Sequence, residues 1–394
     1  MGALSGIRVL ELGQVVAGPY CGQVLADLGA DVVKVEPPGV GDVLRQWGWA
    51  PKGQDSLWWR VAARGKRSIT IDLRTTQGQQ LVRRLAGEVD VVVENFRPGT
   101  LEKWGLSYDE LTADNPGLVL VRISGYGQDG PYAGRPGFAS VGEAMGGLRA
   151  LTGDPDRPPV RVGLSLGDSL TGMAGALGAL AALHERQTSG LGQVVDAAIY
   201  ESVLALTEGL VPEWSVAGLI RERTGAVLKG IAPSNVYPTT DGEVIVAANQ
   251  DSLFARLCAV MGQPELAEDP RFADHKARGE AAEQLDTIIG QWTRTLASAD
   301  LLSALHAASV PAGLVYTPAD MAADPHFAAR NALVEVADPE VGALLMPAPA
   351  PRLSRTPSTV RWAGPRLGQH TDEVLTEAGL TEPDIAALRT AGAI

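Results

Sequence analysis

Cysteine is scarce in this chain, with Cys21 and Cys258 the only two among 394 residues. Two cysteines cannot form a disulfide framework or a cysteine-based metal site. The 5 histidines do not stand at metal-ligand spacing with one another or with a cysteine. The sequence therefore predicts no bound metal, and its cysteine usage favours a reducing, cytoplasmic setting.

Positive charge and long apolar runs are also lacking. Lysine and arginine number 33 against 46 aspartates and glutamates, which gives a net charge of −13. A surface of this sign repels nucleic acid and anionic membranes. The longest apolar run, residues 170–183, has 14 residues, and spanning a bilayer takes ~18. We therefore expect no nucleic-acid partner and no membrane.

The residues that are present have the pattern of an α/β protein. Hydrophobic residues make up 45% of the chain, which excludes wholesale disorder, and its 394 residues predict two or three domains. The runs expected as strands are 8–12, 31–35, 68–73, 89–93, 118–124 and 193–199, and the clearest helices between them are 76–86 and 166–186. Because apolar strands alternate with helices, we expect a parallel sheet covered on both faces.

A different pattern begins after about residue 210. Residues 236–247 hold two apolar runs separated by Pro238-Thr-Thr-Asp-Gly242, which is a hairpin signal. Helical segments follow this hairpin, as in a small α+β domain. The predicted division is a large N-terminal part over 1–210, a linker over 211–225, a small domain over 226–325 and a return segment over 326–394.

A glycine-rich motif follows the strand expected at 118–124. Gly125-Tyr-Gly-Gln-Asp-Gly130 matches the dinucleotide-binding fingerprint, whose last glycine opens a helix that holds a pyrophosphate. Here Pro131 and Pro136 follow among further glycines, and such a sequence does not start a regular helix promptly. We therefore prefer a glycine-rich loop, and the interrupted pattern argues against an NAD-dependent oxidoreductase.

Basic residues concentrate in one short stretch that precedes this motif. Against a single acid, Asp72, it holds the five cations Arg60, Arg64, Lys66, Arg67 and Arg74, a local charge of +4. A positively charged stretch in a chain of negative net charge can bind a small polyanion such as a nucleotide diphosphate. A solvated face with surface ion pairs explains the same composition equally well.

Asp168 stands three residues after Ser165, just before a helix rich in small residues. One interpretation is a capping box, with Ser165 at the N-cap and Asp168 at the third helical position. The other is a carboxylate that the helix dipole keeps ionised and available as a nucleophile. Gly172, Gly175 and Gly178 predict close packing of this helix against a neighbour.

Several blocks in this order together resemble one family, the class III CoA-transferases, which include formyl-CoA transferase and the carnitine and bile-acid CoA-transferases. The blocks are Val9-Leu-Glu-Leu12, Ala17-Gly-Pro19, Leu28-Gly-Ala-Asp-Val-Val-Lys-Val-Glu36, Gly65-Lys-Arg-Ser-Ile-Thr-Ile-Asp-Leu73, Val93-Glu-Asn-Phe-Arg-Pro-Gly99, Ile123-Ser-Gly-Tyr-Gly-Gln128, Val162-Gly-Leu-Ser-Leu-Gly-Asp168 and Leu367-Gly-Gln-His-Thr371. The resemblance covers almost the whole chain. It implies a large Rossmann-like domain built from both chain ends, a smaller inserted domain and an interlocked homodimer.

The resemblance also implies an enzyme whose nucleophile is Asp168 and whose substrate is coenzyme A in acyl-CoA form, with no tightly bound cofactor. It implies an aspartyl anhydride and then an aspartyl-CoA thioester. The CoA contacts it implies fall on Ala17, Ile71, Asp72, Leu73, Arg74, Asn95, Phe96, Arg97 and Lys103. The loop that would contact the substrate or stabilise oxyanions comprises Gly125, Gly127, Gln128, Phe138 and Ala139.

Among the positions that depart from the family pattern, three bear on the chemistry. Val16 replaces the catalytic-loop glutamine of formyl-CoA transferase, and Ala139 replaces an acid, with Glu143 the nearest carboxylate. Phe138 stands where the related 2-methylacyl-CoA racemases carry a histidine base, and phenylalanine cannot move a proton.

We therefore predict transfer of CoA from an acyl-CoA donor to a carboxylic acid. The alternatives are a racemase and a CoA-binding protein that has lost catalysis. Succinyl-CoA with a small dicarboxylate and a bulky lipid-like acid are both compatible with the sequence.

Overall fold

The computed structural model describes residues 2–394, which form two compact units. The larger unit contains residues 2–149, 162–219 and 329–394, and the smaller contains 150–161 and 220–328. The predicted boundaries differ from this division in several places. Residues 150–161 belong to the smaller unit, and the segment expected as a linker from 211 starts inside helix α10 (Leu210–Ala217).

The larger unit is built on a six-stranded parallel sheet with the order β3-β2-β1-β4-β5-β6. Its strands are β1 (Arg8–Glu11), β2 (Asp31–Glu36), β3 (Lys66–Thr70), β4 (Val91–Glu94), β5 (Val119–Ser124) and β6 (Val194–Ala198). The order reverses at β1 and β4, so this is the Rossmann-type arrangement, and the predicted α/β class is confirmed.

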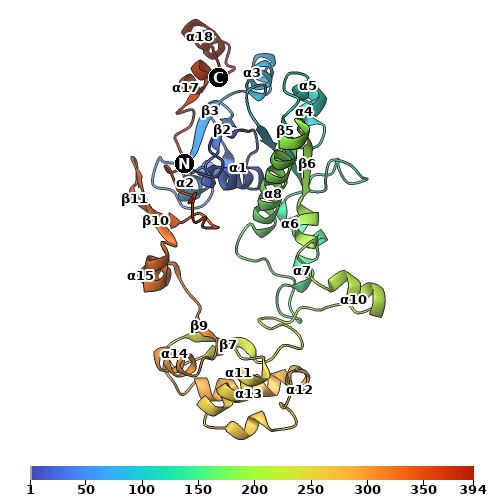
Figure 1. The fold of residues 1–394 in the computed structure, drawn as a ribbon, viewed down its shortest axis with the longest axis vertical. Helices are drawn as coiled ribbons and strands as arrows, with labels where there is room; N and C mark the ends of the chain where they lie inside the picture. The colour runs from blue at the N-terminus through green and yellow to red at the C-terminus, as the bar shows by residue number, and fades with distance from the viewer. Residues whose placement is uncertain (1) are drawn as a thin grey trace. The chain divides into compact units, whose positions relative to one another are not determined.

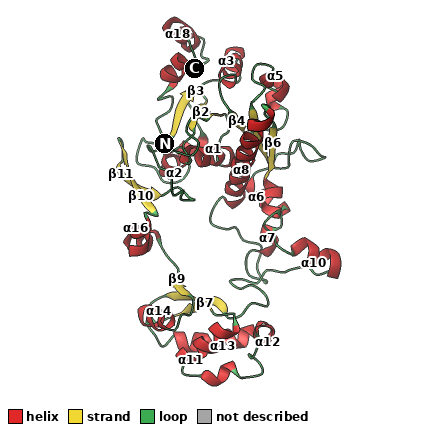
Figure 2. Ribbon diagram, in the orientation of Figure 1, coloured by secondary structure: helices red, strands yellow, loops and turns green. Residues whose placement is uncertain are grey.

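Both faces of the sheet are buried, because successive strand residues point to opposite sides. Val9, Val91 and Val93 belong to the core beneath α1 and α8, whereas Leu10 and Val92 belong to the core on the other face. Figure 2 shows helices on both sides of the strands. Continuous valine and leucine runs are therefore required here.

The helices of the larger unit vary greatly in length. They are α1 (Ala17–Asp27), η1 (Val43–Gln46), α2 (Leu57–Ala62), α3 (Thr76–Ala86), α4 (Thr100–Lys103), α5 (Tyr108–Thr112), α6 (Ala139–Met145), α8 (Leu166–Ser189), α9 (Ile199–Leu204), α10, α17 (Thr371–Glu377) and α18 (Glu382–Thr390). Two further helices, α7 (Leu148–Leu151) and α16 (Pro325–Arg330), cross the boundary between the units.

Helix α8 packs against α1 and against the sheet through glycines singled out in the sequence. A Cβ atom on Gly172 would meet the Ala17 carbonyl oxygen at 2.7 Å, and one on Gly178 would meet Val195 Cγ1 at 2.4 Å. Within residues 2–394, α8 is the one helix long and apolar enough to cross a membrane. Here it lies on the sheet beside β5 and β6 (Figure 1).

The C-terminal segment returns to the larger unit and covers the β3 edge of the sheet. It supplies the hairpin of β10 (Leu333–Asp338) and β11 (Gly342–Pro347) and then α17 and α18. The Trp362 indole N–H donates to the Lys66 carbonyl at 2.8 Å, and the His370 N–H donates to the Ser68 carbonyl at 2.9 Å. Both chain ends therefore build this unit.

The smaller unit is α+β. An antiparallel sheet of order β7-β8-β9 is formed by β7 (Ser234–Pro238), β8 (Glu243–Ala247) and β9 (Ala312–Leu314), with β7 and β8 joined as the predicted hairpin. Its helices are α11 (Asp251–Val260), η2 (Pro264–Ala267), α12 (His275–Glu280), α13 (Ala282–Thr293), α14 (Ser298–Ala307) and α15 (Pro318–Ala323).

Candidate active site

Asp168 lies in the first turn of α8 and is partly buried. Ser165 occupies the N-cap position, but its side chain makes no capping hydrogen bond, so the predicted capping box does not form. The aligned peptide dipoles of a helix this long favour a negative charge at that end. Asp168 is therefore held where an ionised carboxylate is stabilised.

Helix packing brings the next turn of α8 close to the start of α1. Gly172, one turn beyond Asp168, lies against the Ala17 carbonyl and the Cys21 amide. Ala17 is itself the first residue of α1 and is 3% exposed. The turn of α8 that follows Asp168 and the first residue of α1 thus lie side by side, although they are distant in the sequence.

The loop between β1 and α1 is fixed from two sides. Asn95, just after β4, accepts the Gln14 N–H at 2.8 Å through Oδ1 and donates to the Gln14 carbonyl at 2.8 Å through Nδ2. Val15 has a φ of 69°, an unfavourable conformation for a β-branched residue. Its N–H donates to the Asp42 carboxylate at 3.1 Å. Backbone strain of this kind persists only where the surroundings impose it.

A buried ionic cluster lies beneath this loop. Lys34 Nζ donates to the Gly13 carbonyl at 2.6 Å and pairs with Asp42 at 2.9 Å and Glu11 at 3.1 Å. Lys66 pairs with the other oxygen of Glu11 at 2.8 Å. Burial alone would lower the pKa of Lys34, but the carboxylates of Asp42 and Glu11 raise it above its ordinary value. Lys34 therefore stays charged and anchors the loop.

The segment after β3 contains four predicted CoA contacts. Ile71 is buried, Asp72 and Leu73 are partly buried, and Arg74 is exposed. Arg74 donates to Asp72 at 2.9 Å, and this hydrogen bond lowers the pKa of the Asp72 carboxyl. The Asp72 N–H donates to the Ala393 carbonyl at 2.8 Å, so the chain's last residues support this loop.

The segment after β4 contains the other predicted CoA contacts. Phe96 stacks edge-on against Trp104 with ring centres 5.1 Å apart, while Arg97 and Lys103 are exposed. Glu94 accepts the Phe96 N–H at 2.7 Å and pairs with Arg122 at 2.8 Å. Burial raises the pKa of Glu94 to about 7, although Arg122 acts in the opposite direction.

The basic stretch before these segments is not a binding face. Four of its five cations are buried in ion pairs: Arg60 with Asp338 and Glu340, Arg64 with Asp27, Lys66 with Glu11, and Arg67 with Asp31 and Glu377. Their positive charges are neutralised by carboxylates inside the larger unit. The exposed cations among the predicted CoA contacts are Arg74, Arg97 and Lys103.

The glycine-rich segment after β5 is a loop, as predicted, since the next helix, α6, begins only at Ala139. Gly127 has a φ of 90°, and a Cβ on Gly125 would lie 3.1 Å from Gly137 Cα. The Gln128 N–H donates to Asp196 at 2.9 Å. Phe138 caps α6 and is 74% exposed, whereas Ala139 is buried.

One carboxylate beside Asp168 was not recognised from the sequence as part of the site. Glu143 on α6 is 2% exposed and accepts the Gly167 N–H at 3.1 Å, next to Asp168 in the chain. Its second oxygen accepts from Arg149 Nε at 3.0 Å. The sequence marks Glu143 only as the acid nearest to position 139, and no local motif predicts its contact with Gly167.

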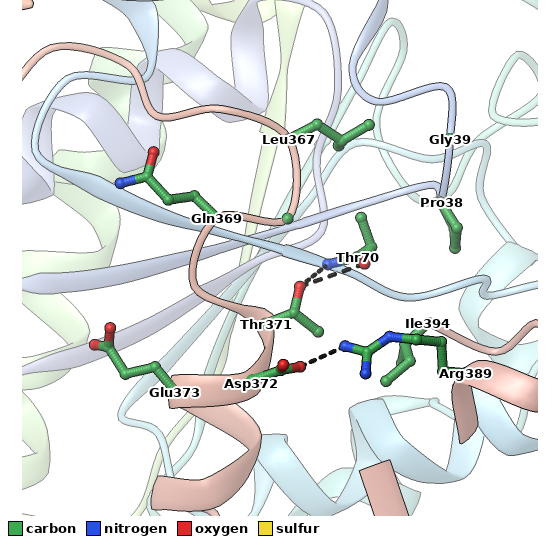
Figure 3. Close-up of a pocket in the computed structure, with 11 residues that line it drawn as sticks. Pro38, Gly39, Thr70, Leu367, Gln369, Thr371, Asp372, Glu373, Arg389 and Ile394 are labelled. Carbon is green, nitrogen blue, oxygen red and sulfur yellow. Dashed lines mark hydrogen bonds and ion pairs between the residues drawn. The ribbon is translucent and has the colours of Figure 1, made fainter. Parts of the chain in front are cut away.

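A separate cavity of about 430 Å³ lies near the ends of β2 and β3 (Figure 3). There the Thr70 N–H donates to Thr371 Oγ1 at 3.1 Å, and Arg389 pairs with Asp372. None of the predicted site residues lines it. Across residues 2–394, no group of three or more histidine, cysteine, aspartate or glutamate side chains is arranged to hold a metal ion.

Comparisons with known proteins find relatives over almost the whole chain. The model of CoA-transferase family III matches residues 4–371. The chain is 57% identical to the succinyl-CoA–D-citramalate CoA-transferase of Chloroflexus aurantiacus, over 98% of this chain and 96% of that protein. It is 42% identical to the succinyl-CoA–L-malate CoA-transferase beta subunit of the same organism, over 98% and 97%. The crystal structure of a CAIB/BAIF family protein from Brucella suis superposes with a TM-score of 0.86 at 37% identity, covering 96% of this chain and 99% of that one.

Proposed function

The chain belongs to CoA-transferase family III and is an acyl-CoA:carboxylate CoA-transferase, and we propose that it moves CoA from succinyl-CoA to a hydroxydicarboxylic acid through covalent intermediates on Asp168. The observation that carries the mechanism is the position of Asp168 in the first turn of α8, whose next turn packs on Ala17. The substrate class comes from the relatives, which are named for citramalate and malate.

The proposed reaction exchanges acyl groups and needs no external energy source. A carboxylate oxygen of Asp168 attacks the thioester carbonyl, the C–S bond breaks, and a mixed anhydride and the CoA thiolate form. The thiolate then attacks the Asp168 acyl carbon, which gives an aspartyl-CoA thioester and releases the donor acid. The acceptor carboxylate attacks this thioester, expels the thiolate and forms a second mixed anhydride with Asp168. The thiolate then attacks the acceptor acyl carbon of this anhydride, which gives the CoA ester of the acceptor and regenerates Asp168.

Each of these steps passes through an oxyanion. Stabilising it requires N–H groups already aimed at the reacting carbonyl, because their reorientation would cost free energy during the reaction. We assign this role to the backbone N–H groups of Gly125 and Tyr126 and of the α8 N-terminus, apart from the Gly167 N–H, which Glu143 already holds. The positive φ of Gly127 and the first turn of α8 support that assignment.

The proposed CoA site follows the ends of β1, β3 and β4. Ligands of Rossmann-type sheets bind beyond the carboxyl ends of the strands, where the strand order reverses. Arg97 and Lys103 are exposed there and would bind the phosphates, with Arg74 as a third cation once it turns from Asp72. Ala17, Ile71 and the Asn95–Phe96 pair would line the apolar part of the ligand.

We further propose a homodimer, interlocked as the family resemblance implies, in a reducing cytoplasm. Apolar side chains support an interface: Met173 and Leu177 on α8 are 52% and 69% exposed, and Trp214 and Val216 on α10 are 60% and 87% exposed. Exposed apolar surface on this scale commonly marks a protein interface. Both cysteines are free and buried, as a reducing compartment allows.

The test is an incubation with succinyl-CoA and a panel of free acids, followed by mass spectrometry of the CoA esters. Citramalate or malate as the acceptor should yield its CoA ester, and a panel without any new CoA ester would contradict the proposal. Deuterium uptake at the α-carbon of a 2-methylacyl-CoA, without CoA transfer, would instead indicate the racemase.

A further inference from the structure

Arg149, on α7 just before the unit boundary, is the arginine that Glu143 holds beside Asp168. Its side chain is 20% exposed. The contact with Glu143 uses Nε, at 3.0 Å from the carboxylate. Within residues 2–394, its two terminal nitrogens donate to no protein acceptor. The end of the guanidinium group therefore remains available to a ligand.

Three more deeply buried arginines of the larger unit use their guanidinium groups more fully. Arg45 pairs with Glu36 and Asp55, and Arg122 pairs with Glu94 and Glu102. Arg67 pairs with Asp31 and Glu377 in the same way. Each of these guanidinium groups bridges two carboxylates, whereas Arg149 has one. A second carboxylate, supplied by a ligand, would give the Arg149 guanidinium the same two partners.

Glu143 connects this arginine to the proposed nucleophile. One Glu143 oxygen holds the Gly167 N–H at 3.1 Å and the other holds Arg149 at 3.0 Å. The guanidinium is therefore separated by a single carboxylate from the residue preceding Asp168.

We propose that Arg149 is the specificity residue that binds the distal carboxylate of a dicarboxylic acyl group, which rests on the CoA-transfer function proposed above. The two terminal nitrogens form a planar fork that matches a carboxylate in a bidentate pair. Glu143 is the positioning residue that orients this fork. A monocarboxylic acyl group leaves the fork without its partner, so it binds less well.

The first test uses the unmodified protein and two donors of equal chain length. Succinyl-CoA carries the distal carboxylate, and butyryl-CoA ends in a methyl group. The expected kcat/KM for succinyl-CoA exceeds that for butyryl-CoA by at least about 100-fold, because a site built for a charged partner rejects the analogue that lacks it. Equal values would overturn the assignment and leave CoA transfer standing.

The second test compares Arg149→Met with Arg149→Lys and with the matched control Arg83→Met. Arg83 lies on α3 and pairs with Asp114, an exposed pair outside the site. Arg149→Met should lower kcat/KM for succinyl-CoA ~10- to 100-fold and leave that for butyryl-CoA within about twofold, since one charged pair is removed. Arg149→Lys should fall between Arg149→Met and the wild type, and Arg83→Met should match the wild type.

The outcomes separate this inference from the function on which it rests. An equal loss with both donors in Arg149→Met would show a purely structural role and overturn the inference. If that variant does not fold, the question is decided by the ratio of kcat/KM for succinyl-CoA to kcat/KM for butyryl-CoA, measured in Arg149→Lys and in the wild type. Failure of the wild type to transfer CoA from any thioester would overturn the proposed function itself.

Discussion

Asn95 clamps the backbone of Gln14 with both ends of its side-chain amide, each at 2.8 Å. The clamp joins the ends of β1 and β4, the two strands at which the sheet order reverses. It also fixes the loop that leads into Ala17. Asn95, which the family resemblance implies as a CoA contact, therefore also stabilises the fold.

Replacing Asn95 should loosen this loop. Asn95→Ala leaves the Gln14 N–H and carbonyl without partners, so we expect a loss of ~1–3 kcal/mol in the free energy of unfolding. The affinity for CoA should fall as well. Asn95→Asp keeps the acceptor for the Gln14 N–H and should lose less. Urea unfolding and CoA titration measure these two effects. An Asn95→Ala protein with unchanged stability and unchanged CoA affinity would contradict the proposed role of the Asn95–Gln14 hydrogen bonds.

Lys34 is the cation on which the buried cluster depends. Lys34→Met leaves Glu11 without one of its two cations and Asp42 without its cation in a buried setting, so we expect ~3–5 kcal/mol of destabilisation. Lys52 lies in an exposed turn, and Lys52→Met should change the stability by less than about 0.5 kcal/mol. Chemical denaturation of both variants tests this difference, and a Lys34→Met protein as stable as the control would refute it.

Arg97 and Lys103 should matter for the nucleotide part of CoA and not for the acyl chain. Arg97→Ala and Lys103→Ala should each raise the KM for succinyl-CoA by about tenfold, or ~1.4 kcal/mol. The same variants should leave the KM for succinyl-pantetheine, which lacks the nucleotide, nearly unchanged. Steady-state kinetics with the two thioesters makes the comparison, and an equal effect on both would exclude phosphate binding by these residues.

His370 should make stability depend on pH. Its Nδ1 accepts the Ser68 N–H at 3.1 Å, and burial lowers the pKa of its imidazole below the ordinary value. Between pH ~6.5 and this lowered pKa, the unfolded chain binds a proton that the folded chain does not. The free energy of unfolding should therefore fall as the pH drops below about 6.5. His370→Asn keeps a hydrogen-bond acceptor but has no imidazole to titrate, so its free energy of unfolding should depend less on pH. An unchanged pH dependence in this variant would rule out His370 as its source.

Much of the large sheet could be predicted from the sequence. Its strands are buried on both faces, so they appear as continuous apolar runs, and the helix expected at 76–86 coincides with α3. Close packing by Gly172 followed from its lack of a side chain. No change in composition marks residues 150–161, so the sequence alone does not indicate that they belong to the smaller unit.

The partners of charged side chains could not be predicted in this way. Arg60 pairs with Asp338, 278 positions away in the chain, and only the return of the C-terminal segment brings the two together. For the same reason a stretch that is strongly basic by composition is buried and neutralised. Lys34 did carry a signal, since a lysine between valines in a buried strand requires a partner. The Glu143 contact with Gly167 depends on how α6 packs against α8, which no sequence spacing reports.

The most direct test of the central claim is to trap the intermediate on Asp168. Incubation with succinyl-CoA and no acceptor, followed by proteolysis and mass spectrometry, should yield the peptide containing Asp168 with a CoA adduct. Asp168→Ala should lack both the adduct and transfer activity while still binding CoA. Turnover by Asp168→Ala at the wild-type rate, or an unmodified Asp168 peptide during rapid turnover, would contradict the proposed mechanism.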